Sequence, residues 1–169
     1  MLIFSSSITE DIYEQTINKH RTNGTIQIHK FNGKKAKYIT QYMIPHVAEE
    51  NPHTVVLVAG GNDIPNKAVS DERLVEIADY LVEGAKKCKE EYGVANVIIS
   101  SVLPRRDSVF QRNRHILNRI LKTYCSEYGF TFLENENIIL KNHVCYDGTH
   151  LNSLGSDVFS DNLLQVLNT

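Results

Sequence analysis

The sequence predicts a single α/β domain, a three-layer α/β/α sandwich built around a five-stranded parallel sheet. Short apolar runs alternate with longer segments in which apolar residues recur at helical spacing. The run Thr54–Ala59 is continuous and rich in β-branched residues, which is typical of a central parallel strand buried on both faces. No repeat, low-complexity tract or linker divides the 169 residues, so we expect one domain that spans positions 1–169.

The expected strands are short apolar runs separated by turn residues and helical segments. The second run alternates Ile26 and Ile28 with polar positions, which suits a less buried strand. The other runs are nearly continuous in apolar residues, as parallel strands covered on both faces should be. In chain order, the strands are expected at 1–4, 25–31, 54–59, 97–99 and 130–133.

The segments that connect these runs carry helix signals. Ser70 is a suitable N-cap, and Gly93 and Gly129 are placed to end two of the helices. Pro45 lies inside another helical segment and predicts a kink or an early break there. In chain order, the helices are expected at 8–20, 35–50, 70–93, 107 or 108 to 129, and from 152 or 153 onward.

Composition bounds the class of protein. A hydrophobic content of 41%, a charged content of 22% and a net charge of -2 are ordinary for a globular domain and do not favour a bulk nucleic-acid binder. The three cysteines, Cys88, Cys125 and Cys145, are widely spaced, so reduced thiols are expected. We see no secretory signal and no apolar run of about 20 residues. We therefore expect a cytoplasmic or intracellular protein, and its start close to the first strand also fits a domain of a longer polypeptide.

The most informative polar segment is Asp147-Gly148-Thr149-His150. A carboxylate three residues before an imidazole can hold the ring in one tautomer and stabilise its protonated form. The histidine can then act as a general base for a nucleophile elsewhere in the chain. Ser7, which follows the first apolar run, is the candidate nucleophile. Because polar residues at the carboxyl ends of parallel strands share one edge of a sheet, this pattern predicts a hydrolase site there.

These residues resemble the SGNH or GDSL-like hydrolases, a family of esterases and acetylhydrolases with a flavodoxin-like fold. The segment Ser5-Ser6-Ser7-Ile8 stands where the family has its Gly-Asp-Ser-Ile nucleophile block. Gly33 resembles the glycine of the second block, and Gly60-Gly61-Asn62-Asp63 resembles the Gly-x-Asn-Asp of the third. Asp147 and His150 are similar to the Asp-x-x-His of the fifth block. The closest overall similarity is to invertebrate SGNH-like domains, some of them encoded by mobile elements.

The resemblance implies that Ser7 is the nucleophile, His150 the base and Asp147 the residue that orients it. It also implies an oxyanion hole made by Gly33, Asn62 and the Ser7 amide. Neutral N–H donors of this kind stabilise the negative charge that develops on the tetrahedral oxygen of an ester. The expected function is hydrolysis of a small carboxylic ester, with a short acyl or acetyl group, through an acyl-enzyme. No cofactor is expected.

The same motifs have structural interpretations. Ser7 and Glu10 also form the Ser-x-x-Glu pattern of a capping box at a helix start. Ser5-Ser6 replaces the family's Gly-Asp, which changes the turn before the nucleophile and favours weak or lost activity. The candidate pocket rim consists of Ser6, Gly61, Asp63, Arg105 and Asn113. For Asp63 a loop cap is the favoured interpretation, and for Arg105 and Asn113 solvated loop polarity is favoured.

No metal site is predicted, because His143, Asp147 and His150 fit no standard zinc spacing. His20, His29, His46 and His53 show no pattern that suggests partners. Two basic clusters follow strand ends and support an alternative hypothesis. In that alternative the chain is a catalytically weak or inactive module that binds RNA or a protein partner through a basic rim. The clusters are Lys30, Lys34, Lys35 and Lys37, and Arg105, Arg106, Arg112 and Arg114.

Overall fold

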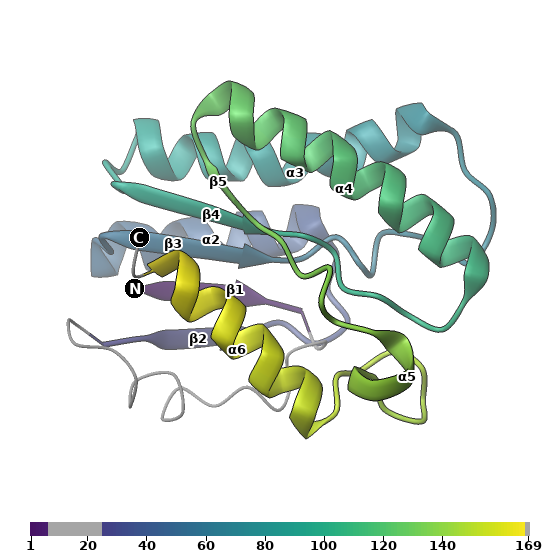
Figure 1. Ribbon diagram of the computed structural model, residues 1–169. Helices are drawn as coiled ribbons and strands as arrows, with labels where there is room; N and C mark the ends of the chain where they lie inside the picture. The colour runs from purple at the N-terminus through teal and green to yellow at the C-terminus, as the bar shows by residue number, and fades with distance from the viewer. Residues whose placement is uncertain (7–24, 168–169) are drawn as a thin grey trace.

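The computed structural model describes residues 1–6 and 25–167 of the chain (Figure 1). Five parallel strands form one sheet in the order β2-β1-β3-β4-β5. The strands are β1 (Leu2–Ser5), β2 (Gln27–Lys30), β3 (Thr54–Val58), β4 (Asn96–Ser100) and β5 (Thr131–Leu133). The helices are α2 (Ala36–Glu50), α3 (Asp71–Glu90), α4 (Ser108–Tyr128), α5 (Leu140–His143) and α6 (Ser153–Leu167).

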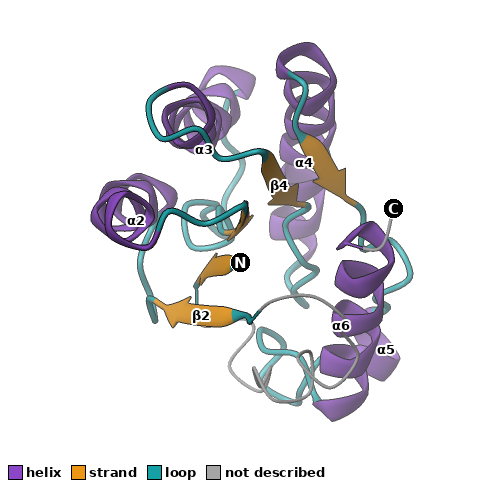
Figure 2. Cartoon of the chain, turned by 90° about the vertical axis from the view of Figure 1, so that its left-hand side faces the viewer, coloured by secondary structure: helices purple, strands orange, loops and turns teal. Residues whose placement is uncertain are grey.

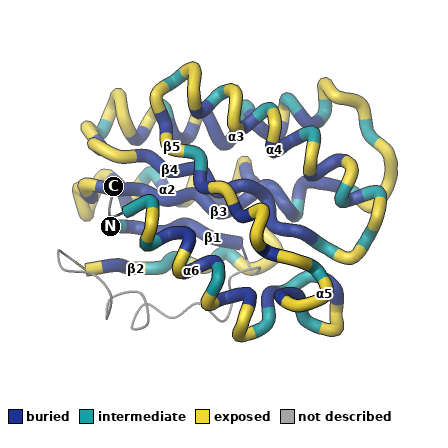
Figure 3. The backbone as a smooth tube through the Cα atoms, in the orientation of Figure 1, coloured by how far each residue is buried: buried dark blue, intermediate teal, exposed yellow. Residues whose placement is uncertain are grey.

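The sheet separates two hydrophobic cores (Figures 2 and 3). Side chains alternate between the faces of a strand, so neighbours in the chain enter different cores. Phe4 and Leu57 are register partners in the core beneath α2, α3 and α4. Ile3 and Val56, one residue earlier on each strand, are partners in the core beneath α6. This alternation produces the three layers predicted from the sequence.

The five expected strands and the parallel sheet are confirmed, with small differences at their ends. The expected helix at 8–20 lies outside the described residues. Pro45 does not break α2, which continues to Glu50. The proline is exposed and so is Gln41, whose carbonyl loses its helical partner and can be hydrated by water instead. The short helix α5 was not predicted, because four residues are too few to show a helical period.

The switch in strand order lies between β1 and β3, because the chain builds β2 on one side of β1 and β3 on the other. Ligands of open α/β sheets bind at the carboxyl ends of the strands near this point. Ser6, which follows β1, is bonded there to the last residue of β3, since the Ser6 amide donates to the Val58 carbonyl at 3.1 Å. No helix among the described residues is both long enough and apolar enough to cross a bilayer.

Candidate functional site

The Asp147–His150 segment is a closed loop between α5 and α6. An antiparallel bridge joins Val144 to Leu151 at its base, and the Cys145 amide donates to the His150 carbonyl at 2.7 Å. Within the loop, His150 Nδ1 lies 2.7 Å from Asp147 Oδ2. The other carboxylate oxygen accepts the backbone amides of Thr149 and His150 at 2.8 and 3.1 Å. The structure therefore brings together the carboxylate and imidazole that the motif predicted.

The hydrogen bonds to Asp147 determine its charge state and the tautomer of the ring. The contact with His150 and the two backbone amides lower the pKa of the Asp147 carboxyl to about 2. An ionised carboxylate only accepts hydrogen bonds, so Nδ1 of His150 is the donor. In neutral His150 the lone pair then lies on Nε2, on the far side of the ring.

The low pKa of Asp147 gives a testable pH dependence. The folded value lies below the value of about 3.9 for an unfolded aspartate. The ionised carboxylate therefore stabilises the fold above that unfolded pKa, and its contribution is lost as the pH falls toward 2. We expect the Asp147 side-chain carboxyl carbon to titrate with a midpoint of about 2, measured by NMR. A midpoint at the unfolded value of about 3.9 would contradict the hydrogen-bonding scheme.

Arg106, in the loop after β4, holds the Asp147–His150 loop in place. Its backbone amide donates to the Gly148 carbonyl at 2.8 Å, and its guanidinium donates to the Tyr146 carbonyl at 2.9 Å. Gly148 has a φ of +75°, and a Cβ there would lie 2.8 Å from the Cβ of Arg106. A glycine is needed at this position for its conformation and for the close approach of the two loops.

Gly155, on α6, fixes the position of α5 directly before the Asp147–His150 loop. A Cβ on Gly155 would lie 2.1 Å from the His143 carbonyl oxygen, which is backbone and cannot rotate away. Asn152 reinforces this junction, because its side chain accepts from the Gly155 amide and donates to the Asn142 carbonyl. The contact between α5 and α6 thus depends on a residue without a side chain.

We expect Gly155→Ala to lower the free energy of unfolding by about 1–3 kcal/mol, because overpacking forces the two backbones apart. Urea denaturation measures this change. Asp157→Ala is the matched control, since Asp157 is exposed on the same helix and should change stability by less than about 0.5 kcal/mol. Equal stability of the two variants would show that α5 does not pack on Gly155 as described.

Asn62 and Gly33, the two hole residues implied by the resemblance, lie on neighbouring segments. Gly33 is exposed with a φ of +71° and belongs to a turn closed by the Lys34 amide and the Phe31 carbonyl. Asn62 Nδ2 donates to the Lys34 carbonyl of this turn at 3.2 Å. The loop after β3 and the turn after β2 therefore meet over the β1 strand that leads to Ser6.

Arg105 sets the orientation of the Asn62 amide. Its Nη2 lies 2.7 Å from Asn62 Oδ1, and a guanidinium can only donate, so the oxygen of Asn62 faces Arg105 and the NH₂ group faces away. The guanidinium lies over the Phe110 ring at 5.0 Å, and its burial lowers the pKa of Arg105 from its usual value. Gly61 leaves space for it, since a Cβ there would lie 3.2 Å from Nη2. Arg105 is thus a partner of Asn62 and Phe110, whereas the sequence favoured a solvated loop residue.

Two residues of the expected pocket rim have structural partners instead. Asp63 is buried, and its carboxylate accepts the Ala36 amide at the start of α2 at 2.8 Å. It takes the place of an N-cap for that helix, whereas the sequence favoured a solvated residue that caps its own loop. Burial raises the pKa of Asp63, and the Ala36 hydrogen bond partly opposes this shift. Asn113 is also buried and donates to the Lys67 carbonyl at 3.0 Å, so it fixes a loop and does not line the rim.

The remaining rim residues border a small cleft at the carboxyl edge of the sheet. Ser6 and Gly61 line it together with Ser101 and Leu103, and its volume of about 10 Å³ is roughly that of one water-sized site. Ser7, the predicted nucleophile, and Glu10, its partner in the alternative capping box, lie outside the described residues. Ser6 directly follows β1, precedes Ser7 and lines this cleft.

The expected basic rim is only partly formed. Arg114 is buried and pairs with Glu136 at 3.8 Å, and Lys37 lies over the Tyr80 ring of α3. Arg114 faces the loop after β5 and Lys37 faces α3, which sequence spacing alone could not show. Lys30, Lys34, Lys35 and Arg112 are exposed, so part of the predicted basic surface remains.

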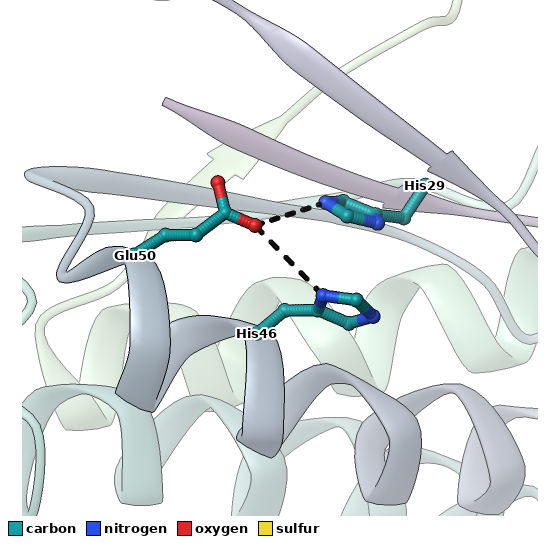
Figure 4. Close-up of side chains that lie close together, drawn as sticks. All are labelled: His29, His46 and Glu50. Carbon is teal, nitrogen blue, oxygen red and sulfur yellow. Dashed lines mark ion pairs between the residues drawn. The ribbon is translucent and has the colours of Figure 1, made fainter.

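The structure also shows a group of side chains that the sequence did not connect. His29 on β2 lies beside His46 and Glu50 on α2, with their potential ligand atoms within 4.8 Å of one another (Figure 4). The His46-to-Glu50 spacing places both side chains on one face of a helix, which was a usable signal. His29 had no local signal. His143, once considered with Asp147 and His150, is buried and accepts the Ile139 amide through Nδ1.

No protein-family model and no curated protein sequence matches the chain. Solved structures of hydrolases do match nearly all of it. A lipase/acylhydrolase from Enterococcus faecalis has a TM-score of 0.75 at 14% identity, with 98% of this chain and 93% of that chain covered. A GDSL-like lipase from Bacteroides thetaiotaomicron has a TM-score of 0.71 at 21% identity, with coverages of 99% and 86%. A catalytic mutant of an acetylxylan esterase from Geobacillus stearothermophilus has a TM-score of 0.77 at 15% identity, with coverages of 97% and 92%.

The chain therefore has the fold of the SGNH/GDSL hydrolases. The predicted resemblance is confirmed for the fold. These structures support no more than the fold, because all three identities are below 25%. What this chain does with the fold depends on its own residues.

Proposed function

We propose that this protein hydrolyses small carboxylic esters at the carboxyl edge of its sheet. Ser7 attacks the ester carbonyl, His150 accepts the serine proton, and Asp147 orients His150. The alcohol leaves with a proton from His150, and the acyl group stays on Ser7. Water then attacks the acyl-enzyme, with His150 again acting as the base.

The Asp147–His150 hydrogen bond is the observation that carries this proposal. Because Asp147 binds Nδ1, the Nε2 lone pair is the one that can take a proton from a serine. The negative carboxylate also stabilises the imidazolium that forms during attack. The pair is partly exposed, with 34% of the His150 side chain and 48% of the Asp147 side chain accessible, so a substrate can reach it.

Three N–H groups are suited to stabilise the oxyanion: the backbone amides of Ser7 and Gly33 and the side-chain amide of Asn62. Arg105 holds the Asn62 oxygen, so the NH₂ group is directed elsewhere. The Lys34 carbonyl accepts one of its two hydrogens, which leaves the second for a substrate oxygen. The Asn62 amide is held by Arg105 and by the Lys34 carbonyl, and a neutral donor preorganised in this way favours the charged transition state over the substrate.

The acyl group is proposed to be short, such as acetyl, because the structural neighbours include acetylxylan esterases, and it would lie at the cleft between Ser6 and Leu103. The buried walls on either side of it, Val58 and Val102, are apolar and form part of the folded core.

Hydrolysis of p-nitrophenyl acetate by the purified protein tests the proposal. We expect turnover by the wild type, a loss of about 10⁴-fold or more in Ser7→Ala, and no change in Ser126→Ala. Ser126 is exposed on α4 and serves as the matched control. Equal rates for wild type and Ser7→Ala would reject the esterase and leave the binding-module hypothesis. Rates that fall from acetate to longer p-nitrophenyl esters would support the short acyl specificity.

A further inference from the structure

A second cluster of chemically active side chains lies between β2 and α2. His29 projects from the edge strand, while His46 and Glu50 project from successive turns of the helix (Figure 4). Glu50 Oε1 is 3.6 Å from His29 Nε2 and 3.8 Å from His46 Nδ1. These residues belong to none of the loops that carry Asp147, His150, Asn62 or Gly33.

Aromatic packing fixes the two imidazoles. The His29 ring stacks on the buried Phe4 ring, with centroids 5.0 Å apart and planes 14° apart. The His46 ring lies 4.2 Å from the His29 ring, on the same side of α2 as Glu50. Side chains held by packing lose little further entropy when they bind a ligand, so the cluster is preorganised.

We propose that His29, His46 and Glu50 bind a divalent transition-metal ion of the Zn²⁺ type. Zn–N and Zn–O bonds of about 2.0–2.1 Å in a tetrahedral site place ligand atoms about 3.3 Å apart. The two separations from Glu50 Oε1 are slightly longer than this and all the ligand atoms lie within 4.8 Å of one another, so side-chain rotations can close the site around an ion. Two imidazoles and one carboxylate leave a fourth position for water.

The donor set selects the class of ion. Imidazole nitrogen suits Zn²⁺, Cu²⁺, Ni²⁺ and Fe²⁺, whereas Mg²⁺ and Ca²⁺ require oxygen ligands. Partial exposure, 22% for the His29 side chain and 27% for Glu50, gives an ion an entry path while the Phe4 side of the cluster stays apolar. An ion here would clamp the edge strand β2 onto α2, and its binding would stabilise the folded protein.

Metal titration of tag-free, chelator-treated protein tests this site. We expect isothermal titration calorimetry to give one Zn²⁺ per chain, and Co²⁺ to produce the visible absorption of a low-coordinate site. His46→Ala and Glu50→Gln should each weaken Zn²⁺ binding by more than about 100-fold, because loss of a direct ligand exceeds the effect of losing an outer-shell partner. His115→Ala, which removes an exposed histidine of α4, is the matched control and should bind as the wild type does. Mg²⁺ should not compete.

Two results would overturn the proposal. One is the absence of Zn²⁺ uptake by the wild type, and the other is uptake that His46→Ala and Glu50→Gln leave unchanged. Glu50→Gln keeps the size of the side chain and its position near the end of α2, so it separates loss of a ligand from loss of folding. Circular dichroism of both metal-free variants confirms that they are folded before they are titrated. Ester hydrolysis is not measured in this experiment, so the metal site and the proposed function are tested separately.

Discussion

His150→Ala should reduce the turnover of p-nitrophenyl acetate by about 10⁴- to 10⁶-fold. In the proposed mechanism, the imidazole is the acid for departure of the alcohol and the base for attack by Ser7 and later by water, so its loss affects both acylation and deacylation. Asp147 cannot substitute, because its carboxylate is tied to two backbone amides as well as to the ring. The measurement is kcat/KM at neutral pH.

The matched control for His150→Ala is His115→Ala, which removes an exposed histidine far along the chain from the Asp147–His150 loop. It should retain wild-type activity. The His150 side chain is partly exposed and lies in a loop held by backbone hydrogen bonds, so its removal should leave the fold intact. Retention of more than a tenth of the activity in a folded His150→Ala variant would be incompatible with a His150 base.

Asn62→Ala is expected to lower kcat by about 10²- to 10³-fold with a smaller effect on KM. In the proposed mechanism, the lost N–H serves the oxyanion, which exists in the transition state and not in the bound substrate. Such losses appear mainly in kcat. Removal of Asn62 also leaves the Arg105 guanidinium without its 2.7 Å acceptor. Steady-state kinetics with p-nitrophenyl acetate separates kcat from KM.

Asn66→Ala is the matched control for the Asn62 prediction, because Asn66 is an exposed asparagine in the same loop. It should change kcat by less than twofold. Arg105→Lys adds a second check, since lysine cannot reproduce the planar contact with Asn62 and should also lower kcat. Similar kcat values for Asn62→Ala and Asn66→Ala would exclude Asn62 from the oxyanion hole.

The sheet could be predicted because its signals are local. The strand Thr54–Val58 is buried on both faces, and a strand of this kind needs apolar residues at consecutive positions, which the sequence shows directly. The alternation of strands with helical segments then leaves few topologies, since crossovers between parallel strands are right-handed. The Asp147–His150 contact could also be predicted, because a three-residue spacing forces the two side chains close together.

The rest of the site depends on contacts between residues that are distant in the chain. Nothing near Asn62 in the sequence indicates that Arg105 would meet it, and nothing near Gly148 indicates Arg106. Such pairs arise because loops after parallel strands meet at one edge, and strand register decides which residues face each other. The same reasoning applies to His29, which reaches His46 and Glu50 only through the packing of β2 against α2.

The central claim is that Ser7 is a nucleophile activated by His150. Treatment with a fluorophosphonate followed by peptide mass spectrometry tests it most directly, since the serine oxygen forms a bond to phosphorus, fluoride leaves and His150 takes the proton. Ser5 and Ser6 provide an internal comparison, because both are buried. The account predicts one adduct per chain, on Ser7, that forms far more slowly in His150→Ala. An unmodified protein, or an adduct on another serine, would contradict it.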